Sequence, residues 1–579
     1  MISPQPGRAI SETDQRSKLI DLVVMGVGLA LFYGILSIAR TWFSPVSPEA
    51  NISLSPAALP IYAGYSLLRI AVAYMCSLTF AVAYGYIAAY NEKAERIMVP
   101  ALDILQSIPV LSFLPGVMLA MAALFPRQQL GLELGSILLI FTGQAWNIAF
   151  SFYSSLKSIP RDLKEAALIN RFSAWQRFVQ LELPYSSIGL VWNSMMSVAG
   201  GWFFLMVCEM FQVGQLQVRL PGLGSYLQTA ANAGDTSAIL WGLAAMVAII
   251  VLLDQLVWRP VTVWANKFKF EEVESASVTE STILNLLRRS AAIAYCQDRA
   301  IAPAAERITR FFLLPAGMQE NSRKPHPARK WIERGLTVVV LIAAAYGVAK
   351  AAQMVTSLSR DELHQIADGT LATFLRVTAA LVIGAAWSIP VGVSIGFSPR
   401  LARVAQPLAQ IAASIPATGL FPVVLLILIN AGLIGTEGKL GAASLLLMLL
   451  GTQWYILFNV IAGAMAIPTD LKEASKVFRF DRLDRWRLLI LPGIFPYLIT
   501  GMVTAAGGAW NASIVAEYMV FQGRVLQTTG LGATIAGASG NFPLLLSATI
   551  VMAGMVVTIN RLVWRRLYRL AETRFKLES

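Results

Sequence analysis

Charged residues are absent from long stretches of this chain, and these stretches recur along nearly its whole length. Each is close to the ~20 apolar residues that an α-helix needs to cross a bilayer. Ten of them contain no Asp, Glu, Lys or Arg: 70–90, 104–126, 134–156, 183–208, 236–253, 377–399, 404–436, 440–469, 488–516 and 541–560. Two further apolar runs, 22–39 and 335–349, precede the first five and the last five. The pattern predicts an all-α integral membrane protein with about twelve transmembrane helices.

The same order of residues is present twice. A polar stretch, EAALINRFSAWQRFVQLELP, begins at Glu165, and a second, EASKVFRFDRLDRWRLLILP, begins at Glu473. Matching residues flank both stretches: Arg69 and Arg376, Gly85 and Gly392, Pro109 and Pro416, Pro160 and Pro468, Trp202 and Trp510, Glu209 and Glu517, Gly222-Leu223-Gly224 and Gly530-Leu531-Gly532. Because six spans is an even number, the two copies are predicted to be parallel six-helix repeats.

The repeat divides the chain into three parts. The first half is expected at 1–263, with a transmembrane core at about 62–260, and the second half at 335–579, with a core at about 368–566. Residues 264–334 are mixed and polar, with two short apolar patches, and are expected to form a cytoplasmic linker.

The distribution of charged residues indicates the orientation of the chain in the membrane. Only 14% of the residues are charged, against roughly 25% in soluble proteins, and the net charge is +13. The positive residues lie in short loops at alternate ends of the spans, such as 91–98 and 157–177, whereas 41–62 has no Lys or Arg. This is the positive-inside pattern and not a nucleic-acid surface. It places both polar stretches and both termini in the cytoplasm, with 22–39 as an uncleaved anchor of an inner-membrane protein.

Candidate chemistry of other kinds is sparse. Cys76, Cys208 and Cys296 form no disulfide framework, and His326 and His364 are far apart, so no metal site is expected. The chain contains no GxxxxGK[ST] phosphate loop, and residues 435–440 come nearest without fitting it.

Each polar stretch is predicted to form two short helices joined by a turn. In the first copy Pro160 and Asp162 suit a helix start, and Ser173 with Gln176 forms a capping pattern for a second helix. Asp481 holds the matching cap position in the second copy. The small residues after Glu165 and Glu473 allow another surface to approach closely.

The two stretches resemble the EAA loop of binding-protein-dependent ABC importer permeases. Glu165-Ala166-Ala167 with Leu-Pro at 183–184 fits that loop, and so does Glu473-Ala474-Ser475 with Leu-Pro at 491–492. The resemblance covers nearly the whole chain in two copies and is closest to the nitrate, sulfonate, taurine and bicarbonate branch. It implies the type I importer permease fold, with two fused halves.

The resemblance also implies a mechanism. The loops would dock on two copies of a separate ATPase, which would bind ATP and Mg, and a periplasmic or lipid-anchored binding protein would deliver the solute. ATP-driven closure would rock the halves and alternate access to a central path. The chain would then be a transport subunit surrounded by membrane lipid and not an enzyme, with Glu165 and Glu473 as coupling residues.

One feature departs from the family. The glycine that the family has between the two loop helices falls at Arg171 and Arg479, each followed by a phenylalanine, Phe172 and Phe480. Glycine is used where the backbone needs positive φ. Either arginine tolerates that strain or the turn differs, and we expect these arginines to contact the ATPase or the loop's own acids.

Residues inside the membrane supply further candidates. Charges there are normally functional or paired, so Arg69 with Glu209 and Arg376 with Glu517 are expected to form pairs, and attraction of an anionic solute by the arginines is the alternative. Two sequence motifs break the third span of each half: Ser107-Ile108-Pro109 and Ser414-Ile415-Pro416. These breaks either kink the helix for packing or line the path. Trp202, Trp510 and Asn511 are candidate path or gate residues, and helix packing is the equal alternative for the two tryptophans.

Two other classes of protein compete with the importer. A secondary transporter driven by an ion gradient also often has six plus six spans, but its coupling would use intramembrane acids without duplicated cytoplasmic loops. A membrane enzyme would need a cluster of His, Asp or Ser residues that the sequence does not show. The expected solute, a small anion, follows from the family resemblance alone.

Overall fold

The computed structural model describes residues 52–125, 128–210, 220–268, 352–432, 440–521, 524–538 and 540–574, with a few isolated positions. The expected spans 22–39 and 335–349 and nearly all of the linker 264–334 lie outside these ranges. The two expected repeats are therefore seen from their second span onward.

The elements described in the first half are all helices. Its α-helices are α2 (Leu59–Tyr90), α3 (Glu92–Ser107), α4 (Leu114–Leu124), α5 (Leu130–Ser158), α6 (Arg161–Ile169), α7 (Ala174–Arg177), α8 (Leu183–Met210), α9 (Leu223–Ala233), α10 (Thr236–Leu253) and α11 (Arg259–Ala265).

The second half repeats this order. Its α-helices are α16 (Arg360–Phe397), α17 (Pro399–Ser414), α18 (Ala417–Asn430), α19 (Gly441–Ala466), α20 (Thr469–Val477), α21 (Arg482–Asp484), α22 (Leu491–Ala516), α23 (Leu531–Gly537), α24 (Phe542–Ile559) and α25 (Arg565–Arg574). A short antiparallel hairpin, β1 (Tyr518–Phe521) with β2 (Arg524–Gln527), is the departure from an all-helical chain in the part described.

Eight helical segments in the described ranges are long and apolar enough to cross a membrane, or up to nine if a bent pair counts as one. Eight of the ten charge-free runs in these ranges therefore form spanning helices. The two that do not, 104–126 and 404–436, were expected to be single spans with a break. In the structure each is shared between two helices.

The break in the first half is a sharp bend. The amphipathic helix α3 ends at Ser107, and the chain then turns by 83° into the helical segment Val110–Leu124, which contains the short apolar helix α4. Ile108 has extended backbone angles, with φ −79° and ψ 130°, and the matching Ile415 has φ −75° and ψ 117°. A residue that precedes proline is pushed out of the helical region, so Pro109 and Pro416 end α3 and α17 where they do.

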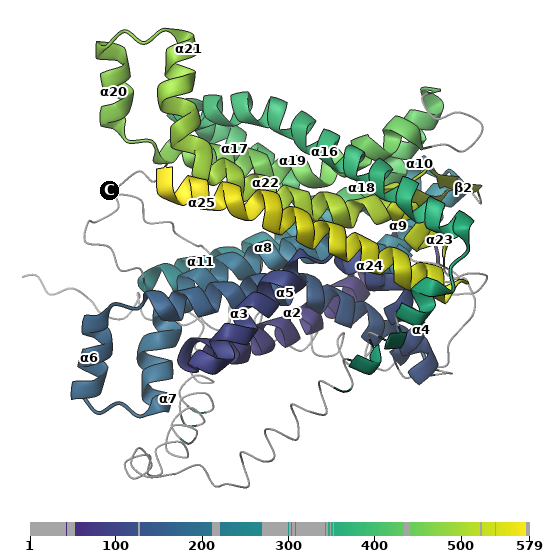
Figure 1. The fold of residues 1–579 in the computed structure, drawn as a ribbon, viewed down its shortest axis with the longest axis horizontal. Helices are drawn as coiled ribbons and strands as arrows, with labels where there is room; N and C mark the ends of the chain where they lie inside the picture. The colour runs from purple at the N-terminus through teal and green to yellow at the C-terminus, as the bar shows by residue number, and fades with distance from the viewer. Residues whose placement is uncertain are drawn as a thin grey trace, which may run out of the picture.

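The two halves have the same orientation. Figure 1 shows α6 with α7 and α20 with α21 projecting from the same end of the molecule, while α9, α23 and β2 lie at the opposite end. Within the first half α2 packs on α5 and α5 on α8, and in the second half α16 packs on α19 and α19 on α22. This is the arrangement that parallel repeats require.

A glycine at matching positions allows the close approach of two of these helices. A Cβ on Gly85 of α2 would lie 2.9 Å from the ring of Phe152 and 3.1 Å from the backbone nitrogen of Tyr153 in α5. On Gly392 of α16 it would lie 2.8 Å from the side chain of Val460 in α19. Small residues at such contacts let membrane helices pack closely.

Replacing Gly85 with alanine is therefore expected to destabilise the protein by about 1–3 kcal/mol, because the added methyl group overpacks the contact between α2 and α5. Gly200→Ala is the matched control, since nothing lies within 4 Å of the Cβ position there. Thermal unfolding in detergent measures both, and equal stability of the two variants would contradict the packing role of Gly85.

Candidate functional site

The two polar stretches form the paired helices that the sequence predicts. In the first, Ser173 Oγ accepts a hydrogen bond from the Gln176 backbone nitrogen at 3.2 Å, and Gln176 Oε1 accepts one from Ser173 N at 2.9 Å. In the second, Asp481 Oδ1 accepts from Asp484 N at 2.6 Å. The side-chain caps satisfy backbone donors at the start of each second helix.

Both turns between the paired helices adopt the same strained conformation. Arg171 has φ +53° and Arg479 has φ +51°, and they are the two non-glycine residues with positive φ in the described ranges. Phe172 N donates to Ala167 O and Arg171 N to Leu168 O, and the second copy repeats both bonds. This is the Schellman ending, whose left-handed position is usually glycine. The arginines therefore adopt the left-handed conformation for which glycine is usual.

Exposure divides each first helix into two faces. Glu165 and Glu473 are exposed, as are Arg171 and Arg479, whereas the third residue of each EAA-like triplet, Ala167 or Ser475, is buried. Ala166 is exposed, and Ala474, Phe172 and Phe480 are half-buried. Large apolar side chains also stand free at the tips: Ile169 is 81% exposed, and Val477 and Phe478 are 78% and 73% exposed. Apolar groups that remain in water at a protruding tip suit a partner surface.

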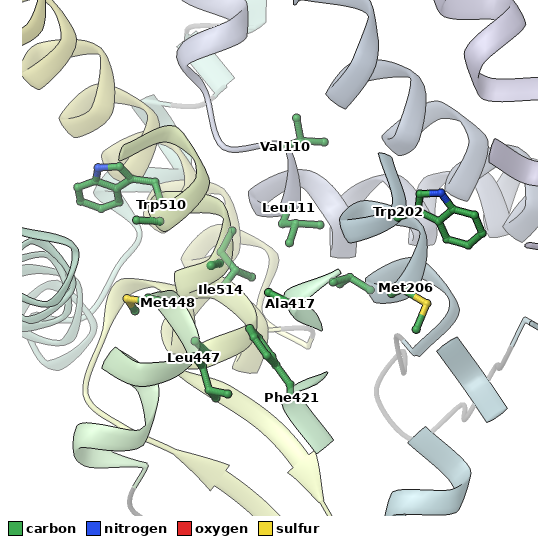
Figure 2. Packing of buried hydrophobic residues seen from close by; sticks show 14 of the residues in the cluster. Val110, Leu111, Trp202, Met206, Ala417, Phe421, Leu447, Met448, Trp510 and Ile514 are labelled. Carbon is green, nitrogen blue, oxygen red and sulfur yellow. The ribbon is translucent and has the colours of Figure 1, made fainter. Parts of the chain in front are cut away.

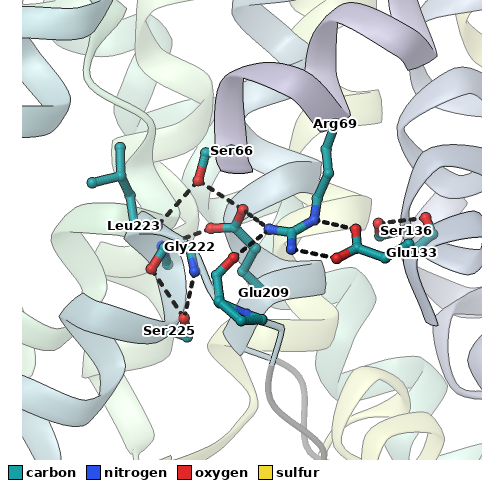
Figure 3. A network of polar contacts seen from close by, with 10 residues as sticks. Ser66, Arg69, Glu133, Ser136, Glu209, Gly222, Leu223 and Ser225 are labelled. Carbon is teal, nitrogen blue, oxygen red and sulfur yellow. Dashed lines mark hydrogen bonds and ion pairs between the residues drawn. The ribbon is translucent and has the colours of Figure 1, made fainter. Parts of the chain in front are cut away.

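A buried charge network joins the other ends of the first half's helices (Figure 3). Arg69 of α2 lies between two carboxylates, with Nη1 2.7 Å from Glu209 Oε1 and Nη2 2.7 Å from Glu133 Oε1. All three side chains are fully buried. Buried charges of this kind are stable only when paired and hydrogen-bonded.

The same network also binds the backbone of the Gly222-Leu223-Gly224 turn at the start of α9. Glu209 Oε2 accepts a hydrogen bond from Gly224 N at 2.8 Å, and Ser66 Oγ donates to Glu209 and accepts from Leu223 N. A Cβ on Gly222 would collide with the Glu209 carboxylate. The turn thus needs glycine because the carboxylate takes the place of a side chain at the start of α9.

The second half repeats this turn with a smaller charge network. Glu517 Oε2 accepts from Gly532 N at 2.8 Å, Thr373 takes the place of Ser66, and Arg376 Nη1 lies 2.8 Å from Glu517 Oε1. Arg376 is 19% exposed and its other nitrogen donates to Thr528. No acidic residue matches Glu133, because the stretch from Leu440 to Thr469 contains none. One carboxylate therefore faces Arg376 where two face Arg69.

The helix breaks carry contacts between the halves. Leu111 N donates to Asn511 Oδ1 of α22 at 3.2 Å, and Thr418 Oγ1 donates to the carbonyl of Phe203 in α8 at 3.3 Å. Thr549 Oγ1 of α24 donates to Ser112 O at 3.3 Å. Each half thus uses the segment after its proline to contact the other half.

Buried apolar side chains pack around these contacts between the halves. Figure 2 shows Leu111 between Trp202 and Met206 on one side and Trp510 and Ile514 on the other. Leu111 and Phe421 are 0% exposed, and both tryptophans are 2% exposed. The candidate path residues Trp202 and Trp510 therefore lie in a packed core that crosses the boundary between the halves.

The remaining path candidates lie at the breaks. Pro109 and Pro416 are buried at the first position after each break, and Asn511 bonds the opposite break. Ser107 and Ser414 are the last residues of α3 and α17, and their side chains lie outside the described set. The sequence comparison did not single out Glu133, Ser66 or Thr373, because Glu133 has no counterpart in the second half and hydroxyl residues are common in spans.

Outside these regions, the described residues hold no cluster of three or more His, Cys, Asp or Glu that suits a metal ion. Partial burial lowers the pKa of Lys472, beside Glu473 in the second loop. Cys76 is exposed and Cys208 is buried as free thiols.

Two parallel halves, a helix pair at the same end of each, and a packed boundary crossed by broken helices define a membrane transport subunit. The model of the family described as binding-protein-dependent transport system inner membrane component matches residues 81–257 and again residues 388–577. The two matches together cover more than half of the chain. The chain belongs to this family and carries its domain twice, so the resemblance that the two polar stretches indicated is confirmed.

Three curated relatives carry names for transport. The nitrate import permease protein NrtB of Synechococcus elongatus is 24% identical over 198 residues, which is 33% of this chain and 66% of the relative. The bicarbonate transport system permease protein CmpB of the same species is 27% identical over 151 residues, 26% of this chain and 51% of the relative. The taurine transport system permease protein TauC of Escherichia coli is 27% identical over 186 residues, 32% and 61%. The chain thus spans about half to two thirds of the length of these relatives.

The strained arginines give a first prediction for this site. Arg171→Gly and Arg479→Gly are each expected to raise stability by about 1 kcal/mol, because the left-handed conformation costs an L-residue about that much or more. Thermal unfolding of the purified protein measures the gain. Lys476→Gly is the control, since Lys476 is an exposed residue of helix α20 and glycine there should destabilise; a loss of stability at Arg171 would argue against strain in the turn.

The unequal charge networks of the two halves give a second prediction. Arg69→Leu leaves two buried carboxylates facing each other and is expected to cost about 3–5 kcal/mol, the usual price of an orphaned buried charge. Arg376→Leu leaves one carboxylate and should cost less. Adding Glu133→Gln to Arg69→Leu should recover part of the loss. Equal losses in the two single variants would contradict the assigned difference between the halves.

Proposed function

We propose that this chain is the complete membrane channel of an ATP-driven importer, in which both loops dock on a separate ATPase. The observation that supports this most directly is the pair of matching helix hairpins, α6 with α7 and α20 with α21, at one end of two parallel halves. Two loops call for two ATPase copies. Glu165 and Glu473 supply an exposed charged anchor in each, beside small residues and an apolar tip.

The ATPase carries ATP and Mg, and this chain supplies the path. A periplasmic or lipid-anchored binding protein delivers the solute, and ATP-driven closure of the ATPase pushes the loops and alternates access between the two sides of the inner membrane. Both termini then lie in the cytoplasm with the loops. A small anion is the solute class that the relatives' names favour, nitrate and bicarbonate above all.

The central packing fits a closed state of such a path. The break segments touch α9 and α23, which lie at the end away from the loops (Figure 1). Leu111, Phe421 and their neighbours then close the path on the periplasmic side, and Asn511 holds the closed break in place. Opening requires the two halves to part along this apolar boundary.

A secondary transporter driven by an ion gradient remains the second candidate for the same architecture. Its ion-coupling groups would be intramembrane acids that gain and lose a ligand. Glu209 and Glu517 are instead each bound by an arginine, a hydroxyl and a backbone N–H group. This full set of partners favours a structural role for the acids and therefore supports the importer.

The anchor glutamates test the proposal. Glu165→Ala with Glu473→Ala is expected to weaken co-purification with the cognate ATPase about tenfold or more, because truncating one member of a charged interface contact typically costs that much. Glu92→Gln changes an exposed acid of α3 and should leave binding unchanged. Uptake that persists without the ATPase and follows an ion gradient would instead establish the secondary transporter.

The arginines at the turns extend this test. We expect Arg171→Gly and Arg479→Gly to reduce ATPase binding while raising the stability of the permease alone, because their exposed side chains would lose a contact on the partner. Unchanged binding would show that these arginines serve the chain without touching the ATPase.

A further inference from the structure

Each loop returns to the membrane through a π-helical turn, a form of helix often associated with function. The turns are Phe178–Glu182 before α8 and Arg485–Ile490 before α22. Arg177 precedes the first turn and the matching Arg485 begins the second. Beside each arginine lies the aromatic residue that ends the first described span of that half, Tyr90 of α2 or Phe397 of α16.

In the first half a buried carboxylate joins these groups. Glu182 is 0% exposed, and its Oε1 accepts a hydrogen bond from Arg177 Nε at 2.7 Å and another from the hydroxyl of Tyr90. The Arg177 guanidinium carbon also lies 4.8 Å from the centre of the Tyr90 ring. Hydrogen bonds to an ionised acceptor are among the strongest in proteins. The end of α2 is thus tied to the base of the first loop.

The second half lacks both partners of this tie. Phe397 has no hydroxyl, and Ile490 stands where Glu182 stands in the first copy. Arg485 and Lys472 lie over the Phe397 ring at 5.6 Å and 4.9 Å. Within the described residues Arg485 Nε has no hydrogen-bond partner, and in the first half Glu182 Oε2 has none either. Ring contacts of this kind are weaker than charged hydrogen bonds.

We propose that Tyr90, Arg177 and Glu182 form a latch that makes the first loop move as one body with α2. The second loop is held to α16 by ring and apolar contacts, without a charged hydrogen bond among the described residues, and yields. This rests on the proposed function, in which the loops receive the motion of the ATPase, and it states how that motion is passed on. Tyr90 and Glu182 are positioning residues, since Glu182 is buried and the Tyr90 hydroxyl donates to it, and neither belongs to the exposed set of Glu165, Arg171 and the apolar tip.

The latch completes a clamp in the first half. The loop continues directly into α8, and the latch ties it to α2. At the far end Arg69 of α2 is bound to Glu209 of α8. The helices α2 and α8 are therefore joined at both ends. In the second half α16 and α22 have the Arg376–Glu517 pair at the far end, and ring and apolar contacts take the place of the latch at the near end. A displacement of the first loop is therefore transmitted to the opposite side of the membrane with less loss than a displacement of the second loop.

Hydrogen exchange of the full chain in lipid nanodiscs tests the latch, because it measures local opening. After correction for intrinsic rates, segment 482–490 is expected to exchange about tenfold faster than segment 174–182, the effect of one charged hydrogen bond. Tyr90→Phe, which copies the second half, should speed exchange in 174–182 by roughly threefold to tenfold and leave 482–490 unchanged.

The reverse substitutions are expected to increase protection from exchange, a result that a partly unfolded variant would not give. Phe397→Tyr with Ile490→Glu supplies Arg485 with an acceptor and should slow exchange in 482–490 to near the rate of the first loop. Glu182→Gln keeps an acceptor oxygen and should retain most of the protection that Glu182→Ile removes. Equal exchange of the two wild-type segments, or no response of 174–182 to Tyr90→Phe, would overturn the proposal.

Binding of the cognate ATPase separates the latch from the proposed function. Tyr90→Phe leaves the docking face intact, so ATPase affinity should stay within about twofold of wild type while the ATPase activity of the assembled complex becomes less sensitive to the binding protein. Lost affinity would mean that Tyr90 shapes the docking face, which contradicts the latch. If the wild-type chain binds no ATPase, the proposed function fails, and the unequal attachment is still decided by the exchange rates.

Discussion

A carboxylate that has no access to water must be paired or hydrogen-bonded, and that requirement organises both halves of this protein. Glu209 and Glu517 each join two other parts of the chain: the first described span, through an arginine and a hydroxyl, and the start of a short helix, through a backbone N–H group. The glycines of the turn, the position of α9 or α23 and the packing of α2 or α16 all follow from this one buried group.

In the proposed transport cycle, the charged networks would hold each half together and the halves would separate at the helix breaks. The extended residues before Pro109 and Pro416 direct the following segments across the boundary, where single hydrogen bonds and apolar contacts hold them. Such contacts can part and re-form without exposing a charge. The charged networks stay within each half, so a rocking motion of rigid halves costs mainly the apolar contacts between them.

Much of this was predictable from the sequence because it repeats. The spans, the parallel halves and the paired loop helices follow from charge-free runs and matched residues, and the family match confirms the class. The sharp bend after α3 was only partly predictable, since a proline marks a break but not its angle. The roles of Glu133 and Glu182 were not predictable for a physical reason: each is a buried acid with a partner on the distant helix α2, Arg69 or Tyr90, and each lacks a counterpart that would reveal it in the repeat.

Comparison of the two repeats shows that backbone strain is present in both copies, whereas one buried contact is present in a single copy. Left-handed arginines at both turns cost the fold free energy twice, and in the described residues neither Arg171 nor Arg479 forms an ion pair that would offset it. The buried tie at Glu182, in contrast, exists once. Strain present in both copies therefore belongs to what both loops do, whereas a contact present in one copy belongs to a difference between the halves. A duplicated chain that bound two identical ATPases could in this way respond to them unequally.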